Sequence, residues 1–522
     1  MTAALKTFAR PCLSAFVLVA VAILGRLPSL RAEATVNVIL WFDTEDYLLP
    51  ASDDAALRVA SLLSSRGIRA TFKVVGEKAR TLERRGRKDV IEALGRHDIG
   101  YHSNFHSVHP TPAEYLAVCG WADGVAEFVR REGPGAEDVR RIFGRSALSC
   151  YGQPGSSWAP QTLAGLPLIA VAPKGVPCYV DSGSHVGLGG EPFWYCGTLT
   201  VYNLRPNETR MDLHRDEAVA PACEEFKKIH DRLAAAGGGL ISIFYHPCEW
   251  VHREFWDGVN FRRGANPPRE QWKAPPQRPK EETEAAFQRF ERYIDFQRSL
   301  PGVKFVTASD LPDLYPDRVR AEGAGVVTAR EVAQAIRGGS PIRMLKTSDG
   351  LTLSAADQFV ILAELLAGSM STGRLPPRVS VPSVLGPSEP PPPALAVDLE
   401  WPAFRDAALD ARDEVARRRQ LPSGVFVGTR RIAPADFLAA MAAVVRDGLE
   451  KADDLKKAAS EGQITFPARV ALPQGTTLEA EQRIAQDTPD LFGGWIIHTE
   501  GFRAPRILEM ARLQAWTLKP AR

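Results

Sequence analysis

The stretch Val36–Asp46, VNVILWFDTED, is an apolar run that ends abruptly in three carboxylates, Asp43, Glu45 and Asp46. Such a run predicts a strand buried on both faces, as parallel sheets require. Carboxylates seldom end a buried strand for stability alone, because removing them from water is unfavourable unless a cation compensates. A turn or a helix start at this point is the structural alternative.

Further apolar runs alternate with helix-patterned stretches as far as Pro316. The predicted later strands are Ala70–Gly76, Leu168–Val171, Leu240–Tyr245 and Val303–Val306, and the predicted helices are Asp54–Ser65 and Asp89–Leu94. Strands separated by helices favour an α/β fold with a parallel sheet or a barrel. In barrels, the chemistry collects at the carboxyl ends of the strands.

The first residues are typical of an export signal. Lys6 and Arg10 precede the apolar run Leu13–Leu24, and Ala32–Ala34 offers a cleavage site between small residues. The run is shorter than the roughly 20 residues that span a bilayer, so we predict a cleaved signal peptide over residues 1–34 and no stable membrane span. The protein would then be secreted or periplasmic. An uncleaved N-terminal anchor is the alternative.

Composition excludes some partners. The 522 residues are 45% hydrophobic and 24% charged, with a formal net charge of +2, so nothing indicates a nucleic-acid partner. An exported chain permits disulfides, although the sequence cannot give their pairing. The spacing matches no zinc cluster, and we interpret the cysteines after Cys12 as structural or simply buried. They are Cys119, Cys150, Cys178, Cys196, Cys223 and Cys248.

Histidines cluster between His97 and His109, where four of the ten histidines occur. His102 and His106 have the i, i+4 spacing that brings two imidazoles to one side of a helical turn, where they can share a metal ion. Two histidines and one carboxylate with open positions suit a catalytic divalent metal, for which we favour zinc. A lone histidine would more often be a satisfied polar residue.

Two further motifs follow. In Tyr151–Trp158, YGQPGSSW, Pro154 and Gly155 bring the backbone close to a ligand, and Trp158 offers a flat face for stacking on a sugar. An ordinary loop with one buried tryptophan is the alternative. In Ile241–Trp250, ISIFYHPCEW, His246 follows an apolar strand and therefore belongs to the same strand-end face.

Together these motifs resemble the polysaccharide deacetylase family, also called the NodB-homology domain or carbohydrate esterase family four. The similarity covers Val36 to Pro316. It implies a distorted barrel of about seven β/α units acting on an N-acetylated glycan. It also implies that Asp43 is the catalytic base, that His246 is the catalytic acid, and that His102–His106 carries the metal ligands.

Three positions depart from the family pattern. The acid that binds the metal must be Glu45 or Asp46, and we favour Glu45 because positions two apart share one side of a strand. Gly152 stands where the family has an arginine that keeps the catalytic aspartate charged. Lys73 replaces an apolar residue, and we hypothesise that it supplies the missing cation. Asp181 either orients His246 or its loop, or is a turn residue, and we favour the turn.

Residues 317–522 differ in character. They lack cysteine and are expected to form a smaller, mainly helical region, with a Pro-rich linker near residues 376–394. An apolar-Pro-x-x-Val pattern recurs at Leu375–Val379, Leu421–Val425 and Phe466–Val470, after amphipathic helices such as Ala355–Leu366 and Ala435–Val445. The pattern is faintly similar to pseudomurein-binding repeats, which implies binding to a cell-wall glycan. A small helical domain with turn prolines is the alternative.

The sequence thus predicts a metal-dependent hydrolase of carbon–nitrogen (non-peptide) bonds that removes N-acetyl groups from an amino-sugar polysaccharide. A small-molecule amide hydrolase on the same fold is one alternative, favoured by a closed pocket rather than an open groove. A non-catalytic glycan-binding protein is the other, favoured by the missing arginine.

Overall fold

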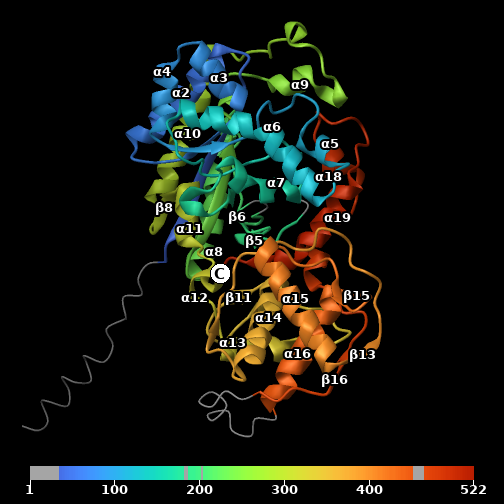
Figure 1. Ribbon diagram of the computed structural model, residues 1–522. Coiled ribbons are helices and arrows are strands. Elements are labelled where there is room, and N and C mark those ends of the chain that lie inside the picture. The colour runs from blue at the N-terminus through green and yellow to red at the C-terminus, as the bar shows by residue number, and fades with distance from the viewer. Residues whose placement is uncertain (1–33, 182–185, 202–203, 451–463) are drawn as a thin grey trace, which may run out of the picture.

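The computed structural model describes residues 34–181, 186–201, 204–450 and 464–522 (Figure 1). Residues 1–33, and with them Cys12 and nearly all of the predicted signal peptide, lie outside the described residues. Within the described residues, no helix combines the length and the apolarity that crossing a membrane would need. The six cysteines from Cys119 to Cys248 are free thiols.

A curved parallel sheet organises the first part of the chain. Its central strand β1 (Val36–Thr44) pairs with β7 (Gly239–Tyr245) on one side. On the other side, β8 (Val303–Val306) pairs with the first half of β1 and β2 (Thr71–Val74) with its last residues. Strand β3 (Asp98–Tyr101) continues the sheet beyond β2.

The sheet continues past β3 through single bridges at Tyr151, which connect β3 to β4 (Cys178–Tyr179). Strands β6 (Thr198–Thr200) and β5 (Phe193–Tyr195) follow β4 in space. The result is a strongly curved α/β sheet, which confirms the predicted fold class.

Helices surround this sheet (Figure 1). Helix α2 begins with a proline in its first turn, where the missing N–H is not needed, and buries alanine, valine and leucine side chains against the sheet. The helices of this part are α2 (Pro50–Ser65), α3 (Gly76–Arg84), α4 (Lys88–Gly95), α5 (Pro112–Leu116), α6 (Trp121–Ile142), α7 (Pro160–Gly165), α8 (Val219–Ala235), α9 (Trp256–Asn260), α10 (Lys280–Ser299), α11 (Leu311–Leu314) and α12 (Arg318–Glu322).

One predicted strand is wrong. The apolar residues Leu168–Val171 were expected to form a strand, but Leu166–Ile169 form a 3₁₀ turn that ends at Ala170 in the left-handed conformation (φ 58°). A short apolar run does not distinguish a strand from a buried turn by itself, and Pro167 starts the turn. The strands predicted at the other four places are present.

The second part of the chain contains an internal duplication. Each copy runs strand, helix, two-stranded hairpin, helix, strand, and its first and last strands pair antiparallel with each other. The first copy comprises β9 (Ala324–Gly325), α13 (Val326–Ala335), β10 (Leu345–Lys346), β11 (Thr352–Leu353), α14 (Ala355–Thr372) and β12 (Arg378–Val379). The second comprises β13 (Val397–Glu400), α15 (Trp401–Arg418), β14 (Val425–Val427), β15 (Arg430–Ile432), α16 (Pro434–Glu450) and β16 (Arg469–Leu472).

We call residues 324–472 the duplicated unit. The three Pro-x-x-Val segments each lead into a short strand, β12, β14 or β16, but the repeating element is larger than that pattern. The sequence around the start of the second helix of each copy is related, LSAAD at Leu353–Asp357 and IAPAD at Ile432–Asp436. The Pro-rich stretch 387–393 lies between the two copies, where Glu389 N donates to Ser423 Oγ at 3.1 Å.

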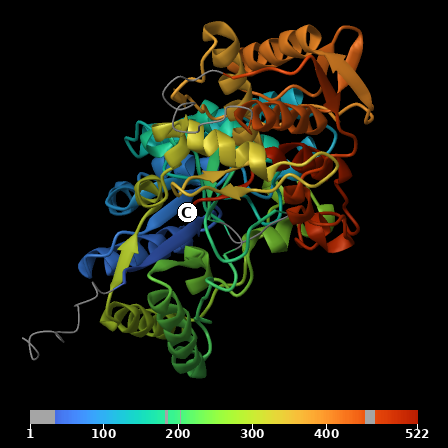
Figure 2. The same ribbon diagram turned by 90° about the horizontal axis from the view of Figure 1, so that it is seen from below.

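The chain then returns to the first part. Residues 479–522, which we call the return segment, contain α18 (Pro489–Gly493), α19 (Pro505–Gln514) and β17 (Lys519–Pro520). Strand β17 pairs antiparallel with β5 of the sheet. Figure 2 shows the duplicated unit, yellow and orange, to one side of the sheet, with the red return segment running back along it. The expectation of one separate C-terminal region over 317–522 therefore needs correction, because Phe492, Ile507 and Leu518 belong to the core of the sheet unit, residues 35–316.

Candidate active site

Polar side chains gather where the parallel strands end. Asp43 and Glu45 lie at the end of β1, His102 follows β3, and His246 follows β7. All four line one cavity of about 460 Å³. Parallel alignment of β1, β2, β3 and β7 puts their carboxyl ends at one edge, which is why residues far apart in sequence meet here.

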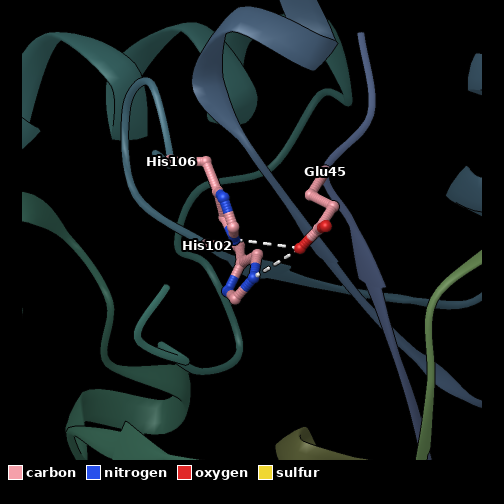
Figure 3. Close-up of side chains that lie close together, drawn as sticks. All are labelled: Glu45, His102 and His106. Carbon is pink, nitrogen blue, oxygen red and sulfur yellow. Dashed lines mark ion pairs between the residues drawn. The ribbon is translucent and has the colours of Figure 1, made fainter. Parts of the chain in front are cut away.

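Glu45, His102 and His106 form the metal-type cluster. The Glu45 Oε2 atom lies 2.9 Å from His106 Nε2 and 3.5 Å from His102 Nε2. Figure 3 shows the Glu45 carboxylate facing both imidazole rings. One ligand atom from each residue lies within 4.8 Å of the others, and all three side chains are buried. This donor set fits a divalent ion, since two histidines and a carboxylate leave positions open for substrate and water.

The loop that carries the two histidines is not a helical turn, contrary to expectation. Ser103 and His106 both adopt left-handed backbone conformations, with φ of 67° and 57°. The loop is held by His106 N, which donates to Ser103 Oγ at 3.1 Å, and by Asn104 N, which donates to the buried Glu132 Oε2 at 2.7 Å. Such conformations persist only where the surroundings impose them, and they are common at functional sites.

The Nδ1 atoms of both histidine rings have hydrogen-bonding partners. His102 Nδ1 lies 2.9 Å from the Gly152 carbonyl oxygen, and His106 Nδ1 lies 2.6 Å from Ser107 Oγ. Ser107 Oγ in turn donates to Asp257 Oδ2 at 2.9 Å. Partners of this kind orient metal-binding imidazoles, and here they leave both Nε2 atoms directed at Glu45.

The carboxylates and imidazoles of the cluster favour one another's charged forms. Burial alone would raise the pKa of Glu45, but His106 and His246 hold it well below its ordinary value. Burial would lower the pKa of His106, yet Glu45, Asp257 and Asp43 raise it. A field that favours a proton on an imidazole also favours a metal cation in its place.

Asp46 does not join the cluster. Its Oδ2 atom lies 2.9 Å from His252 Nδ1, and its Oδ1 accepts from Leu48 N at 2.7 Å. The alternative that Asp46 is the metal acid is therefore wrong: Asp46 pairs with His252, whereas Glu45 groups with both histidines.

Lys73 stands beside Asp43, as hypothesised from the sequence. Residues 43 and 73 are neighbours in the β1–β2 pairing, and Lys73 Nζ lies 2.8 Å from Asp43 Oδ1. A Cβ atom at Gly152 would come within 2.0 Å of Lys73 Nζ, so the lysine occupies the space beside the glycine. Burial alone would raise the pKa of Asp43, but His102, Lys73 and His246 together lower it.

Asp181 is the second partner of Lys73. Its Oδ2 atom lies 3.2 Å from Lys73 Nζ, and Asp181 also lines the cavity. Burial would lower the pKa of Lys73, but Asp181 and Asp43 raise it, so the lysine stays charged. Asp181 thus contributes to the charge arrangement of the site and is more than the turn residue we favoured.

His246 faces the cavity from the end of β7. Its Nε2 atom lies 3.6 Å from Asp43 Oδ2, and its Nδ1 atom lies 2.5 Å from Glu249 Oε1. Burial would lower the pKa of His246, but Glu45, Glu249 and Asp43 raise it to about 9. This raised pKa favours the protonated imidazole, the form from which a proton can be donated.

The expected sugar-stacking tryptophan is in the wrong place. Trp158 is 1% exposed and packs in the core against Tyr179, at 5.5 Å between ring centroids. Gly155 does line the cavity, while Pro154 shapes the same loop by accepting a hydrogen bond from Ser157 N. The aromatic residues that line the cavity are Trp41, Phe244, Phe255 and Trp495.

Comparison with known proteins gives distant matches only. No family model matches the chain, and no curated protein sequence matches it. Solved structures resemble its first part. One described as a polysaccharide deacetylase from Mycobacterium smegmatis has 15% identity and a TM-score of 0.35, over 56% of this chain and 93% of that one. Puue allantoinase has 14% identity and a TM-score of 0.33, over 55% and 93%.

A third solved structure is the Xyl-CE4 domain of a multidomain xylanase from the hindgut metagenome of Trinervitermes trinervoides, with 12% identity and a TM-score of 0.29, over 54% of this chain and 91% of that one. Similarity at this level decides neither family nor activity. The functional argument for this chain therefore rests on the site itself.

Several site residues escaped the sequence analysis. Asp257 and Glu249 orient His106 and His246, but isolated acids in loops give no signal of their own. Phe255 and Trp495 line the cavity, and Trp495 comes from the return segment, far from every motif. Only the folded chain brings these residues to the strand ends.

Proposed function

We propose that the chain is a metal-dependent hydrolase that removes N-acetyl groups from an amino-sugar glycan. One observation supports this proposal most strongly: a cluster of two histidines and a carboxylate shares a cavity with Asp43, which pairs with Lys73, and with His246, which pairs with Glu249. That combination supplies a metal site, a base and an acid within a single pocket, as amide hydrolysis needs.

Glu45, His102 and His106 would hold the ion, for which zinc suits the nitrogen-rich donor set. When bound, the cation polarises the acyl oxygen and lowers the pKa of a water molecule. Asp43 is kept charged by Lys73 and takes the proton of the attacking water. His246 donates a proton to the departing amine nitrogen. Glu249 keeps His246 protonated, and Asp257 acts through Ser107 to orient His106.

The missing arginine does not argue for a non-catalytic protein, because Lys73 lies 2.8 Å from Asp43 and provides the cation that Gly152 cannot. A small-molecule amide hydrolase remains the second candidate. It is favoured by one feature, the wall that the return segment adds to the cavity through Trp495 and Ile496.

We also propose export through the predicted signal peptide, and attachment of the duplicated unit to a cell-wall glycan. The support for attachment is the internal repeat, because repeated units are common in modules that bind repeating polymers. A pull-down of the protein with insoluble wall glycan, compared with a chain lacking residues 324–472, tests this part.

The central experiment measures acetate release from a panel of N-acetylated glycans together with zinc content. Asp43→Asn should keep the zinc but lower kcat by about 10²–10⁴-fold, the usual contribution of a positioned base. His102→Ala should lose both zinc and turnover. His230→Ala is the matched control, because that histidine lies on α8 and bonds to the Pro301 carbonyl oxygen at 2.8 Å. Acetate release unaffected by either site substitution would exclude the proposal.

A further inference from the structure

The return segment forms one wall of the catalytic cavity. Trp495 and Ile496 line it together with the metal-type cluster, although they lie in the last part of the chain. The Trp495 ring lies edge-to-face against the imidazole of His106, with centroids 5.7 Å apart. The segment thus touches the proposed metal site directly.

This wall is held to the sheet unit by hydrogen bonds. Arg263 N donates to the Ile496 carbonyl oxygen and Gly264 N to the Ile497 carbonyl oxygen, both at 2.8 Å. Behind the wall, His498 is 2% exposed and its Nε2 lies 3.1 Å from Thr111 Oγ1. The return segment is therefore bonded on two sides to loops of the sheet unit.

Gly155 makes room for the tryptophan. It has a φ of 53°, and a Cβ atom there would come within 2.3 Å of the Trp495 ring. Any other residue would both strain the backbone and push the indole away. The loop predicted to approach a ligand thus approaches Trp495, which in turn faces the cavity.

A second aromatic residue, Phe255, lines the same cavity next to His246. Phe255 packs edge-to-face on His246 at 4.9 Å, just as Trp495 packs on His106. Phe255 and Ile496 are 38% and 43% exposed, unusual for large apolar side chains, and both line the cavity. Exposed apolar groups around a polar reacting centre are typical of a surface that a ligand covers.

We propose that Trp495 and Phe255 form an aromatic clamp that determines specificity by holding a ring of the substrate beside the scissile amide. This inference rests on the proposed function and deepens it. The ligand part is a six-membered ring with an apolar face, such as the C–H face of a pyranose. Trp495 and Phe255 are specificity-determining residues, and the proton transfers remain with Asp43 and His246.

The first test is kinetic. Trp495→Ala should lower kcat/KM on the best N-acetylated glycan about 3- to 10-fold, mainly through KM, which corresponds to the loss of one aromatic contact. Trp495→Phe should recover most of this loss, and zinc content should not change. Trp401→Ala is the control, because that half-buried tryptophan stacks on Phe466 in the duplicated unit at 4.4 Å. Unchanged KM in Trp495→Ala overturns the clamp.

The second test needs no turnover. Hydroxamates bind zinc directly, so calorimetry can compare benzohydroxamate, which has a ring, with acetohydroxamate, which has none. The zinc-loaded wild type should prefer benzohydroxamate about 3- to 10-fold, and Trp495→Ala should lose that preference. A preference retained in Trp495→Ala overturns the clamp.

The two tests separate the clamp from the proposed function. Hydroxamate preference that depends on Trp495 in a protein releasing no acetate supports the clamp and overturns the glycan deacetylase. Acetate release that is unchanged in Trp495→Ala supports the glycan deacetylase and overturns the clamp. A wild type that binds neither hydroxamate overturns both.

Discussion

The sheet unit and the duplicated unit differ in where their buried charges lie. In the sheet unit, Asp43, Glu45 and Lys73 are buried around a cavity, at the ends of strands. In the duplicated unit, the buried acid Asp357 accepts from Ser354 N at 2.9 Å and also pairs with Arg320 and with Lys519 Nζ, the latter at 2.9 Å. The buried acid Asp436 accepts from Thr476 N at 2.9 Å. Acids matched by cations and N–H groups need no further partner, whereas carboxylates and imidazoles gathered around a cavity suit a ligand.

The two units also differ in which segments of the chain complete their hydrophobic cores. The duplicated unit is continuous in sequence and completes its own core from Val319 to Leu478, with Trp516 added. The sheet unit is discontinuous, because its core also includes the return segment. The part of this chain that holds the candidate active site therefore depends more heavily on the return segment.

Truncation of the return segment is expected to have the largest effect and tests directly how far each unit depends on that segment. A chain ending at Leu478 costs the duplicated unit one core side chain, Trp516, but removes β17, α19 and Trp495 from the sheet unit. We expect acetate release to fall to background, because the core and the cavity wall are both lost. Circular dichroism should still report helix from the duplicated unit. A chain ending at Pro316 that folds cooperatively and keeps its turnover would contradict the dependence.

Lys73→Met should have the next largest effect. Removing one partner of a buried ion pair costs about 3–5 kcal/mol, and the pKa of Asp43 should rise without its cation, so both stability and kcat/KM fall. Urea unfolding and acetate release measure the two losses. Lys78→Met is the matched control. Lys78 is about as buried as Lys73, and its Nζ atom lies 2.5 Å from Asp53 Oδ1. Neither Lys78 nor Asp53 lines the cavity.

The double variant sharpens this prediction. Asp43→Asn combined with Lys73→Met should lose less stability than the two single changes added together, because neither partner then leaves the other unpaired. Strict additivity of the unfolding free energies would mean that the pair is not coupled.

Glu249→Gln should shift a pH profile. Glu249 raises the pKa of His246, so its removal should lower that pKa from about 9. Activity that needs protonated His246 is present below this pKa and is lost as the pH rises through it. The basic limb of kcat/KM against pH should therefore move to lower pH. Glu254 lines the same cavity, so Glu254→Gln is the control and should leave the basic limb of the kcat/KM profile unchanged. An equal shift of the basic limb in Glu254→Gln would refute a specific role for Glu249.

The smallest effect on turnover is expected in the duplicated unit. Phe359→Ala removes a fully buried side chain from its core and should cost about 3–5 kcal/mol of unfolding free energy. At temperatures where the variant is folded, kcat/KM should equal that of the wild type. A change in kcat/KM there would show that the two units are coupled.

Local patterns predicted the strands and the polar cluster well. The apolar runs that became β1, β2, β7 and β8 and the paired histidines are signals contained within a few residues. Trp158 and Trp495 show where prediction from local sequence fails. Trp158 follows a Gly-Pro loop and looked like a ligand contact, but it packs in the core, and the loop's Gly155 instead accommodates Trp495. No local pattern could connect Trp495 to His106, because only tertiary packing brings the return segment to the cavity.

The return segment also sets an order in time. Ribosomes add about 5–20 residues per second, so Trp495 emerges on the order of tens of seconds after His106. During that interval the nascent chain carries its histidines, its acids and an incomplete hydrophobic core, and contacts between such distant segments form slowly. Completion of the hydrophobic core and of the cavity wall therefore waits until the return segment has been made.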